Sequence, residues 1–105
     1  MTERILLVDD DHGVLEFCSC LLSKNKFAVT ACSSAAEALA FMRGGSYDIL
    51  LTDLNLGDGC GTDLLAFSKL VAPAARALLM TGDAAQPAAL KKPFTGRELL
   101  SAVSA

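Results

Sequence analysis

The feature that most constrains the fold lies mid-chain, where the apolar run Ile49–Leu51 is preceded by Asp48 and followed by Thr52 and Asp53. An apolar run this short, without polar alternation, is typical of a strand buried on both faces, as in a parallel sheet. A glycine-rich loop at residues 57–61 follows and predicts a turn, so the strand has to end near Asp53. Asp53 is therefore expected at the carboxyl edge of the sheet, where ligands bind in open α/β folds.

Strand-like and helix-like segments alternate along the whole chain. Strands are expected at residues 4–8, 27–32, 49–53, 76–80 and, more weakly, 88–91. Helices are expected from an Asp11 N-cap to about residue 24, from a capping box at 34–37 to 44, from Thr62 or Asp63 to about 72, and after a second capping box at 95–98. This alternation predicts a parallel sheet with right-handed crossovers and helices on both faces.

Length and composition limit the remaining possibilities. A chain of 105 residues is long enough for one core, so a single domain spanning residues 1–105 is expected. The hydrophobic fraction of 52% excludes disorder, and a net charge of −3 argues against direct binding to nucleic acid. No apolar run approaches the ~20 residues of a membrane span, and the N-terminus does not resemble a signal peptide, so the expected location is the cytoplasm. The four cysteines match neither a zinc ribbon nor a CxxC redox pair.

Polar side chains follow the predicted strands at the edge where the strands end. They are Asp9 and Asp10 after the first strand, Asp53 at the end of the third, Thr81 after the fourth and Lys92 after the last. Crowded carboxylates repel one another unless a cation joins them, and Mg²⁺ prefers such oxygen ligands. Metal, ammonium and hydroxyl groups around one carboxylate are what phosphoryl transfer needs, since its chemistry is mostly positioning and charge neutralisation. Asp53 is thus a candidate nucleophile that would form an aspartyl phosphate.

The same residues carry a resemblance to a known family. The blocks Ile5–Asp11, the strand ending at Asp53, Met80–Gly82 and Lys92–Phe94 resemble, in this order, the signatures of receiver domains of two-component response regulators. The resemblance covers essentially the whole chain. It implies a three-layer α/β/α flavodoxin-like fold with a five-stranded parallel sheet in the order 2-1-3-4-5.

The resemblance also implies a role for each residue of the phosphorylation site. Asp53 would take a phosphoryl group from a phosphohistidine on a sensor histidine kinase or a histidine phosphotransfer protein. Thr81 would bond to one phosphoryl oxygen and Lys92 would pair with another. Lys92 rather than its neighbour Lys91 is chosen because it directly precedes Pro93-Phe94, and the Lys92-Pro93 peptide is often cis in this family.

A magnesium site is implied at the same place. Asp10 and Asp53 would bind Mg²⁺ directly, Asp9 through water and Asn55 through its backbone carbonyl. Asp58, in contrast, is expected to be only a solvated loop residue.

The chain departs from the family pattern between Thr81 and Lys92. If residues 88–91 form the last strand, only residues 82–87 remain for a crossover that ordinarily takes at least ~10–12 residues. The fourth helix is therefore predicted to be shortened or absent and the last strand short, with a swap of the C-terminal segment between two chains as one way to complete the fold. The family's aromatic on the last strand, three residues before the lysine, is replaced by Ala89.

Several functions remain as hypotheses. The leading one is a phosphorylatable, Mg²⁺-dependent receiver that signals to a downstream protein, is not a turnover enzyme, and is a monomer or a weak or swapped dimer. The alternative is a degenerate receiver that acts as a protein-interaction or phosphate-sink module. A small aspartyl-phosphate phosphohydrolase is disfavoured because Asn55 stands where such enzymes usually carry a second Asp. A flavin-binding flavodoxin relative is disfavoured because the first loop is acidic.

Overall fold

The sheet has the strand order that the resemblance implies. A computed structural model describes residues 2–83 and 88–104. Its parallel sheet has the order β2-β1-β3-β6-β7. The strands are β1 (Arg4–Val8), β2 (Ala28–Cys32), β3 (Ile49–Asp53), β6 (Arg76–Thr81) and β7 (Leu90–Lys91), and a separate antiparallel pair consists of β4 (Asn55–Leu56) and β5 (Gly59–Cys60). The predicted flavodoxin-like fold is confirmed.

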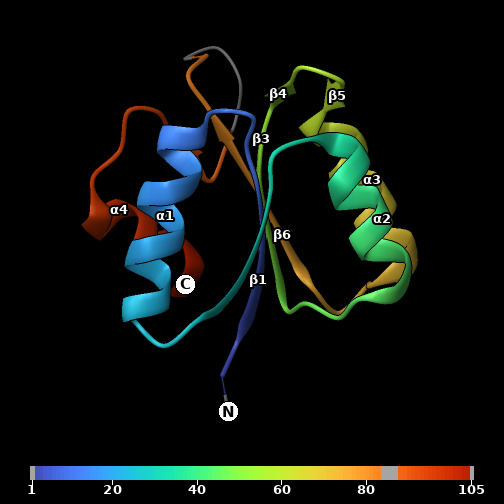
Figure 1. The fold of residues 1–105 in the computed structure, drawn as a ribbon, viewed down its shortest axis with the longest axis horizontal. Helices are drawn as coiled ribbons and strands as arrows, with labels where there is room; N and C mark the ends of the chain where they lie inside the picture. Colours follow the sequence, from blue (N-terminus) through green and yellow to red (C-terminus); the bar gives the residue numbers. More distant parts are fainter. Residues whose placement is uncertain (1, 84–87, 105) are drawn as a thin grey trace.

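In the described part of the chain, four helices cover the two faces of the sheet. They are α1 (His12–Lys24), α2 (Ala35–Gly44), α3 (Gly61–Val71) and α4 (Gly96–Ser104). In Figure 1, α1 and α4 lie on one side of the sheet and α2 and α3 on the other. None of the described helices is long and apolar enough to cross a membrane.

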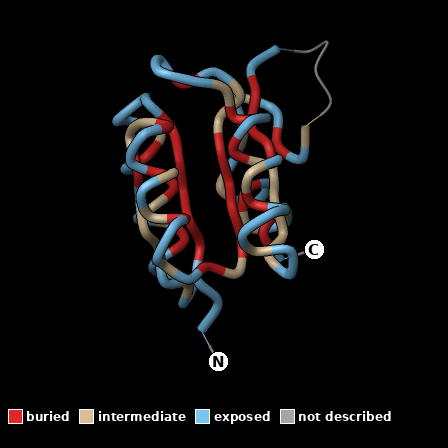
Figure 2. Tube along the Cα trace, turned by 90° about the vertical axis from the view of Figure 1, so that its right-hand side faces the viewer, coloured by how far each residue is buried: buried red, intermediate tan, exposed pale blue. Residues whose placement is uncertain are grey.

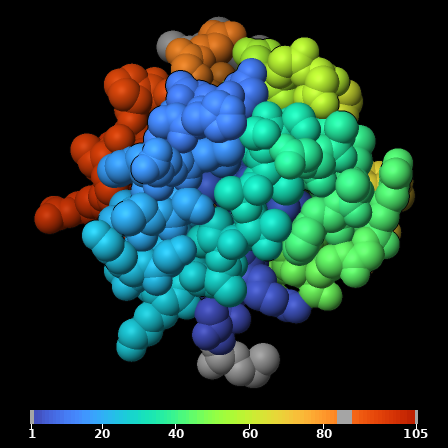
Figure 3. Space-filling model, viewed as in Figure 1, coloured from blue at the N-terminus to red at the C-terminus, as the bar shows by residue number. Residues whose placement is uncertain are grey.

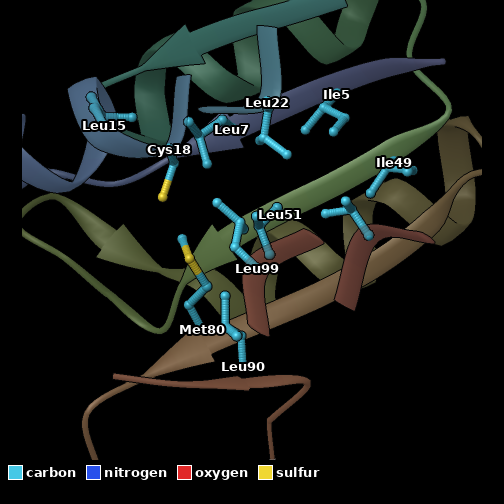
Figure 4. Packing of buried hydrophobic residues seen from close by; sticks show 11 residues of the cluster. Ile5, Leu7, Leu15, Cys18, Leu22, Ile49, Leu51, Met80, Leu90 and Leu99 are labelled. Carbon is cyan, nitrogen blue, oxygen red and sulfur yellow. The ribbon is translucent and has the colours of Figure 1, made fainter. Parts of the chain in front are cut away.

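Two apolar clusters lie on the two faces of the sheet, and alternate residues of β1 supply both. Ile5 and Leu7 belong to the cluster under α1 and α4, whereas Leu6 and Val8 belong to the one under α2 and α3. Figure 4 shows side chains of the first cluster, from α1, β1, β3 and α4, pointing toward one another. The central strands β1 and β3 are buried almost throughout, and the outer faces of the helices are exposed (Figure 2). This burial on both faces explains why the β1 and β3 sequences lack polar alternation.

The helices begin at or near the predicted capping residues, but two details of the prediction were wrong, one at α2 and one at α3. Asp11 caps α1 as predicted, and at α4 both capping-box hydrogen bonds between Thr95 and Glu98 are present. At α2 the Ser34 hydroxyl accepts from the Glu37 N–H, but the Glu37 carboxylate bonds to Ser33 instead of returning to Ser34. Helix α3 begins at Gly61, earlier than predicted, and its N-cap residue makes no side-chain cap. The β4–β5 hairpin ends at Cys60, and α3 follows without a connecting loop, which explains why the helix begins one residue early.

The connection from β6 to β7 is the unusual part of the fold. β7 has only two residues, as the short-strand prediction required. The described residues of the connection, 82–83 and 88–89, contain no helix, and the chain has four helices in its described ranges, in agreement with a shortened fourth-helix region. The rest of this prediction concerns residues 84–87, which lie outside the described part of the chain.

The carboxyl ends of β1, β3 and β6 all lie at one end of the molecule. In the space-filling view the segments that follow β1, β3 and β6 meet at the top (Figure 3). The register of the strands explains this. Val8 pairs with Thr52, and Asp53 pairs with Met80, so the residues that follow these pairs lie at the same height along the sheet.

Candidate functional site

Three aspartates meet at this edge of the sheet. Asp9 and Asp10 follow β1, and Asp53 is the last residue of the neighbouring β3. Each offers a carboxylate oxygen, and these oxygens all lie within 4.8 Å of one another. Asp9 is fully buried, Asp53 is half-buried and Asp10 is exposed, so the cluster opens to solvent on the side of Asp10.

Lys92 inserts its ammonium group among these carboxylates. Its Nζ lies 2.6 Å from Oδ2 of Asp9 and 3.2 Å from Oδ1 of Asp53. Burial by itself disfavours the charged ammonium, but the hydrogen bond to Asp9 and the charges of Asp9 and Asp53 outweigh burial and raise the pKa of Lys92. The neighbouring Lys91 is exposed, with its Nζ 3.5 Å from the carbonyl oxygen of Asp83. The structure thus places Lys92, and not Lys91, against the aspartates.

Asp53 has the environment of a carboxylate that needs a cation. Burial raises its pKa above the ordinary value, the charge of Asp9 raises it further, and Lys92 lowers it. Three carboxylates face one lysine, so negative charge remains in excess within the cluster. This donor set of closely spaced oxygens fits a hard divalent cation such as Mg²⁺.

Thr81 and Asn55 lie at the same edge of the sheet, one at the end of β6 and the other two residues after Asp53. Thr81 ends β6 and is buried, and its hydroxyl oxygen accepts from the Asp83 N–H at 3.0 Å. Its carbonyl accepts from the Lys92 N–H at 2.8 Å, which ties the end of β6 to the residue that carries the ammonium. Asn55 begins β4, two residues after Asp53, and is exposed. Their assigned roles toward phosphate and metal stay predictions.

The loops around the site are held by the carboxylates themselves. Oδ1 of Asp9 accepts from the Asp11 N–H at 2.9 Å, and Oδ2 of Asp10 accepts from the Gly57 N–H at 3.2 Å. The second bond links the loop after β1 to the β4–β5 hairpin. Asp10 therefore connects the acidic cluster to the hairpin.

Asp58, at the tip of the hairpin, has a role that the sequence did not reveal. Its two carboxylate oxygens accept from the backbone N–H groups of Ala35 and Ala36 at 2.8 and 3.0 Å. It therefore caps the start of α2, and these two backbone hydrogen bonds lower its pKa below the ordinary value. The expectation that Asp58 is merely solvated was wrong, because its partners lie more than twenty residues away in sequence, beyond any local capping pattern.

Replacing Asp58 with Ala should lower the melting temperature at pH 7, because two N–H groups at the start of α2 lose their acceptor. Since folding depresses the Asp58 pKa, its stabilisation is present above the ordinary value of 3.8 and is lost as pH falls through the lower, folded-state value. The difference in melting temperature between variant and parent should therefore shrink below about pH 4. Thermal unfolding from pH 7 to pH 3 checks this, with Asp63→Ala, on the exposed side of α3, as control. A difference that stays constant with pH would contradict the cap.

A parallel five-stranded sheet with an acidic cluster and a lysine at its carboxyl edge defines the class of flavodoxin-like phosphoacceptor domains. The model of the response regulator receiver domain matches residues 5–104. The chain therefore belongs to the receiver domain family of two-component response regulators.

Individual relatives agree with this assignment. The alginate biosynthesis transcriptional regulatory protein AlgB of Pseudomonas syringae is 35% identical over 82 residues, which are 78% of this chain and 18% of AlgB. A CheY-like receiver domain protein from Methanospirillum hungatei superposes with a TM-score of 0.91 at 27% identity, covering 99% of this chain and 92% of that one. A Burkholderia pseudomallei response regulator with a phosphorylated aspartic acid and a calcium ion superposes with a TM-score of 0.86 at 26% identity, over 95% of this chain and 65% of that one.

The chain spans about a fifth of the length of the first curated relatives that it matches. The comparison with these relatives therefore concerns their receiver portion.

Proposed function

We propose that this chain is a phosphoacceptor that takes one phosphoryl group onto Asp53 from a phosphohistidine of a sensor histidine kinase or a histidine phosphotransfer protein. The observation that carries the proposal is the position of Asp53, within 4.8 Å of two further carboxylates and 3.2 Å from the Lys92 ammonium. A phosphoryl group attached there would enter a site that already contains the cation needed to neutralise part of its charge.

The reaction is a transfer between two side chains. A carboxylate oxygen of Asp53 attacks phosphorus, the bond between phosphorus and the donor imidazole nitrogen breaks, and the imidazole leaves with the electron pair of that bond and takes up a proton. Lys92 pairs with a phosphoryl oxygen, and the Thr81 hydroxyl donates to another. The product on Asp53 is a mixed acid anhydride, which water can later hydrolyse. Each chain accepts one phosphoryl group at a time and assists this transfer and its reversal without being a turnover enzyme.

Mg²⁺ is the cofactor that we propose for this site. Asp10 and Asp53 would hold it directly, Asp9 through water, and Asn55 through its carbonyl. When bound, it neutralises charge that develops on the transferring phosphoryl oxygens. The structure of the Burkholderia relative contains a phosphorylated aspartic acid and a calcium ion, and this supports the proposal of a divalent cation in such a domain.

The output of the proposed receiver differs from the family pattern. Ala89 is exposed just before β7 and offers no ring that could change position when Thr81 moves toward a phosphoryl group. We propose that residues 1–105 act as one receiver unit whose signal to a downstream protein runs through the hairpin that Asp10 and Gly57 connect to the site.

The test is phosphorylation with phosphoramidate, read by intact mass. With Mg²⁺ the chain should gain the mass of one phosphoryl group, and removal of the metal with a chelator should reduce the gain strongly. Asp53→Asn should abolish the gain, whereas Asp63→Asn, on the exposed side of α3, should retain it. A chain that gains no phosphoryl group in any condition would favour the alternative, a degenerate receiver that serves as an interaction module.

A further inference from the structure

Asp10 is the least restrained carboxylate of the acidic cluster. Asp9 is fully buried and Asp53 is half-buried, and both contact the Lys92 ammonium. Asp10 is exposed, and among the described residues its carboxylate accepts one hydrogen bond, from the Gly57 N–H at 3.2 Å. An exposed side chain with several rotamers loses conformational entropy when a ligand fixes it. The Gly57 N–H is therefore the contact that holds Asp10 ready for a cation.

The place of Gly57 in the β4–β5 hairpin leaves its N–H available for this contact. Leu56 pairs with Gly59, so Gly57 and Asp58 form the turn between them. The hydrogen bond of a β-turn joins the residues on either side of the two central ones, so the N–H of the first central residue has no partner within the turn. Neither Gly57 nor Asp58 has a positive φ. Proline suits the first central position of such a turn, so Gly57→Pro should keep the turn and remove only the donor.

Asp58 fixes the same turn to α2. Its two carboxylate oxygens accept from the first two backbone N–H groups of α2, at 2.8 and 3.0 Å. Close packing adds to these bonds, because a Cβ at Gly59 would lie only 3.0 Å from the Cβ of Ala35. Two adjacent residues, Gly57 and Asp58, thus connect the carboxylate of Asp10 to the start of α2.

We propose that Gly57 and Asp58 are positioning residues for the divalent cation of the acidic cluster, an inference that rests on the proposed function. The Gly57 N–H orients the Asp10 carboxylate, and Asp58 holds that N–H in place by fixing the turn to α2. An ionised carboxylate has about four acceptor sites, so Asp10 can keep this hydrogen bond while it binds a cation. Because coupling between two sites is reciprocal, a bound cation should in turn strengthen the contact between Asp58 and α2.

Calorimetric titration with Mg²⁺ tests the role of Gly57. Gly57→Pro should weaken Mg²⁺ binding about tenfold, since hydrogen-bond partners of metal ligands typically have effects of this size or larger. Gly57→Ala is the matched control, because it keeps the N–H and its Cβ would lie in ordinary contact, 3.7 Å from Oδ2 of Asp10. Its Mg²⁺ affinity should stay close to that of the parent. Circular dichroism verifies the fold of both variants.

A double-mutant cycle tests the role of Asp58. Asp58→Ala should weaken Mg²⁺ binding at least about threefold in the parent and should have no further effect in the Gly57→Pro chain, because Asp58 acts through the Gly57 N–H. Loss of the Asp58 charge by itself would instead have the same effect in both chains. Ser34→Ala is the control for a weakened helix start, because the Ser34 hydroxyl caps α2 through the Glu37 N–H. It should leave the Mg²⁺ affinity unchanged.

Amide hydrogen exchange provides a readout on the parent chain. Saturating Mg²⁺ should slow exchange at the N–H groups of Gly57, Ala35 and Ala36, and in Gly57→Pro the effect at the start of α2 should be lost. If Gly57→Pro does not fold, exchange in the parent and the comparison of Asp58→Ala with Ser34→Ala decide the question.

Three results would each overturn the inference. They are an unchanged Mg²⁺ affinity in folded Gly57→Pro, an additive effect of Asp58→Ala in the cycle, and exchange in the parent that is the same with and without Mg²⁺. A parent that binds no Mg²⁺ would overturn the proposed cofactor together with this inference. Phosphorylation of Asp53 is read separately by intact mass, so a parent that binds Mg²⁺ and is phosphorylated, but whose affinity ignores Gly57→Pro, refutes the positioning role alone.

Discussion

Replacing Gly61 with alanine is expected to cost about 3 kcal/mol or more of folding free energy and to lower the melting temperature by at least about 10 °C. A Cβ at this position would overlap the backbone carbonyl oxygen of Asp53, 3.0 Å from its carbonyl carbon and 3.1 Å from Cδ1 of Leu79. A backbone carbonyl at the end of the central strand β3 has no rotamer to change, so either β3 or the start of α3 has to shift. Because the displaced atom belongs to Asp53, phosphorylation should fall as well.

Gly44→Ala is the matched control for this prediction. Gly44 is the last residue of α2, its φ is not positive, and a Cβ there would meet no atom within 4 Å. Alanine in a helix should leave stability unchanged or raise it by up to about 1 kcal/mol. Thermal and denaturant unfolding of the two variants measures the contrast. Equal stability of the two variants would show that α3 does not pack against Asp53 as described.

Replacing Lys92 with methionine is expected to cost about 3–5 kcal/mol of stability in metal-free buffer, because it leaves a fully buried carboxylate without its cation. The Asp9 side chain is 0% exposed and accepts from Lys92 at 2.6 Å. Mg²⁺ should restore part of the lost stability, since it supplies positive charge to the same cluster. Denaturant unfolding with and without Mg²⁺ measures both effects.

The neighbouring lysine provides the control. Lys91→Met replaces the preceding lysine, whose side chain is exposed. It should lower the free energy of unfolding much less than Lys92→Met does, and this loss should depend little on Mg²⁺. If Lys91→Met proved as costly as Lys92→Met, the loss could not be assigned to the buried ion pair at Asp9.

Most of the fold could be predicted because its signals are local. The apolar runs that became β1, β3 and β6, the Asp11 cap and the Thr95–Glu98 capping box all depend on residues within a few positions of one another. Burial of the parallel strands on both faces then requires helices between them, so the three-layer architecture followed from the alternation of elements.

The candidate cluster was predictable for a topological reason. In a parallel sheet every strand ends at the same edge, so the residues that follow the strands come together whatever their separation in sequence. Asp9 and Asp53 are 44 positions apart, yet the register of β1 and β3 places them side by side. The choice of Lys92 over Lys91 depended on the family resemblance, since adjacent residues on a short strand carry no other distinguishing signal.

What the sequence alone determined about this protein is therefore the order of its strands and helices and the residues that meet at one edge of the sheet. The tertiary structure decided where Asp58 finds its partners, where α3 begins and how few residues β7 has. These features depend on contacts between segments that are distant in sequence, and on the few residues that the shortened connection leaves for β7. Local propensity contains no information on such contacts, because their free energy arises only once the sheet has brought the segments together.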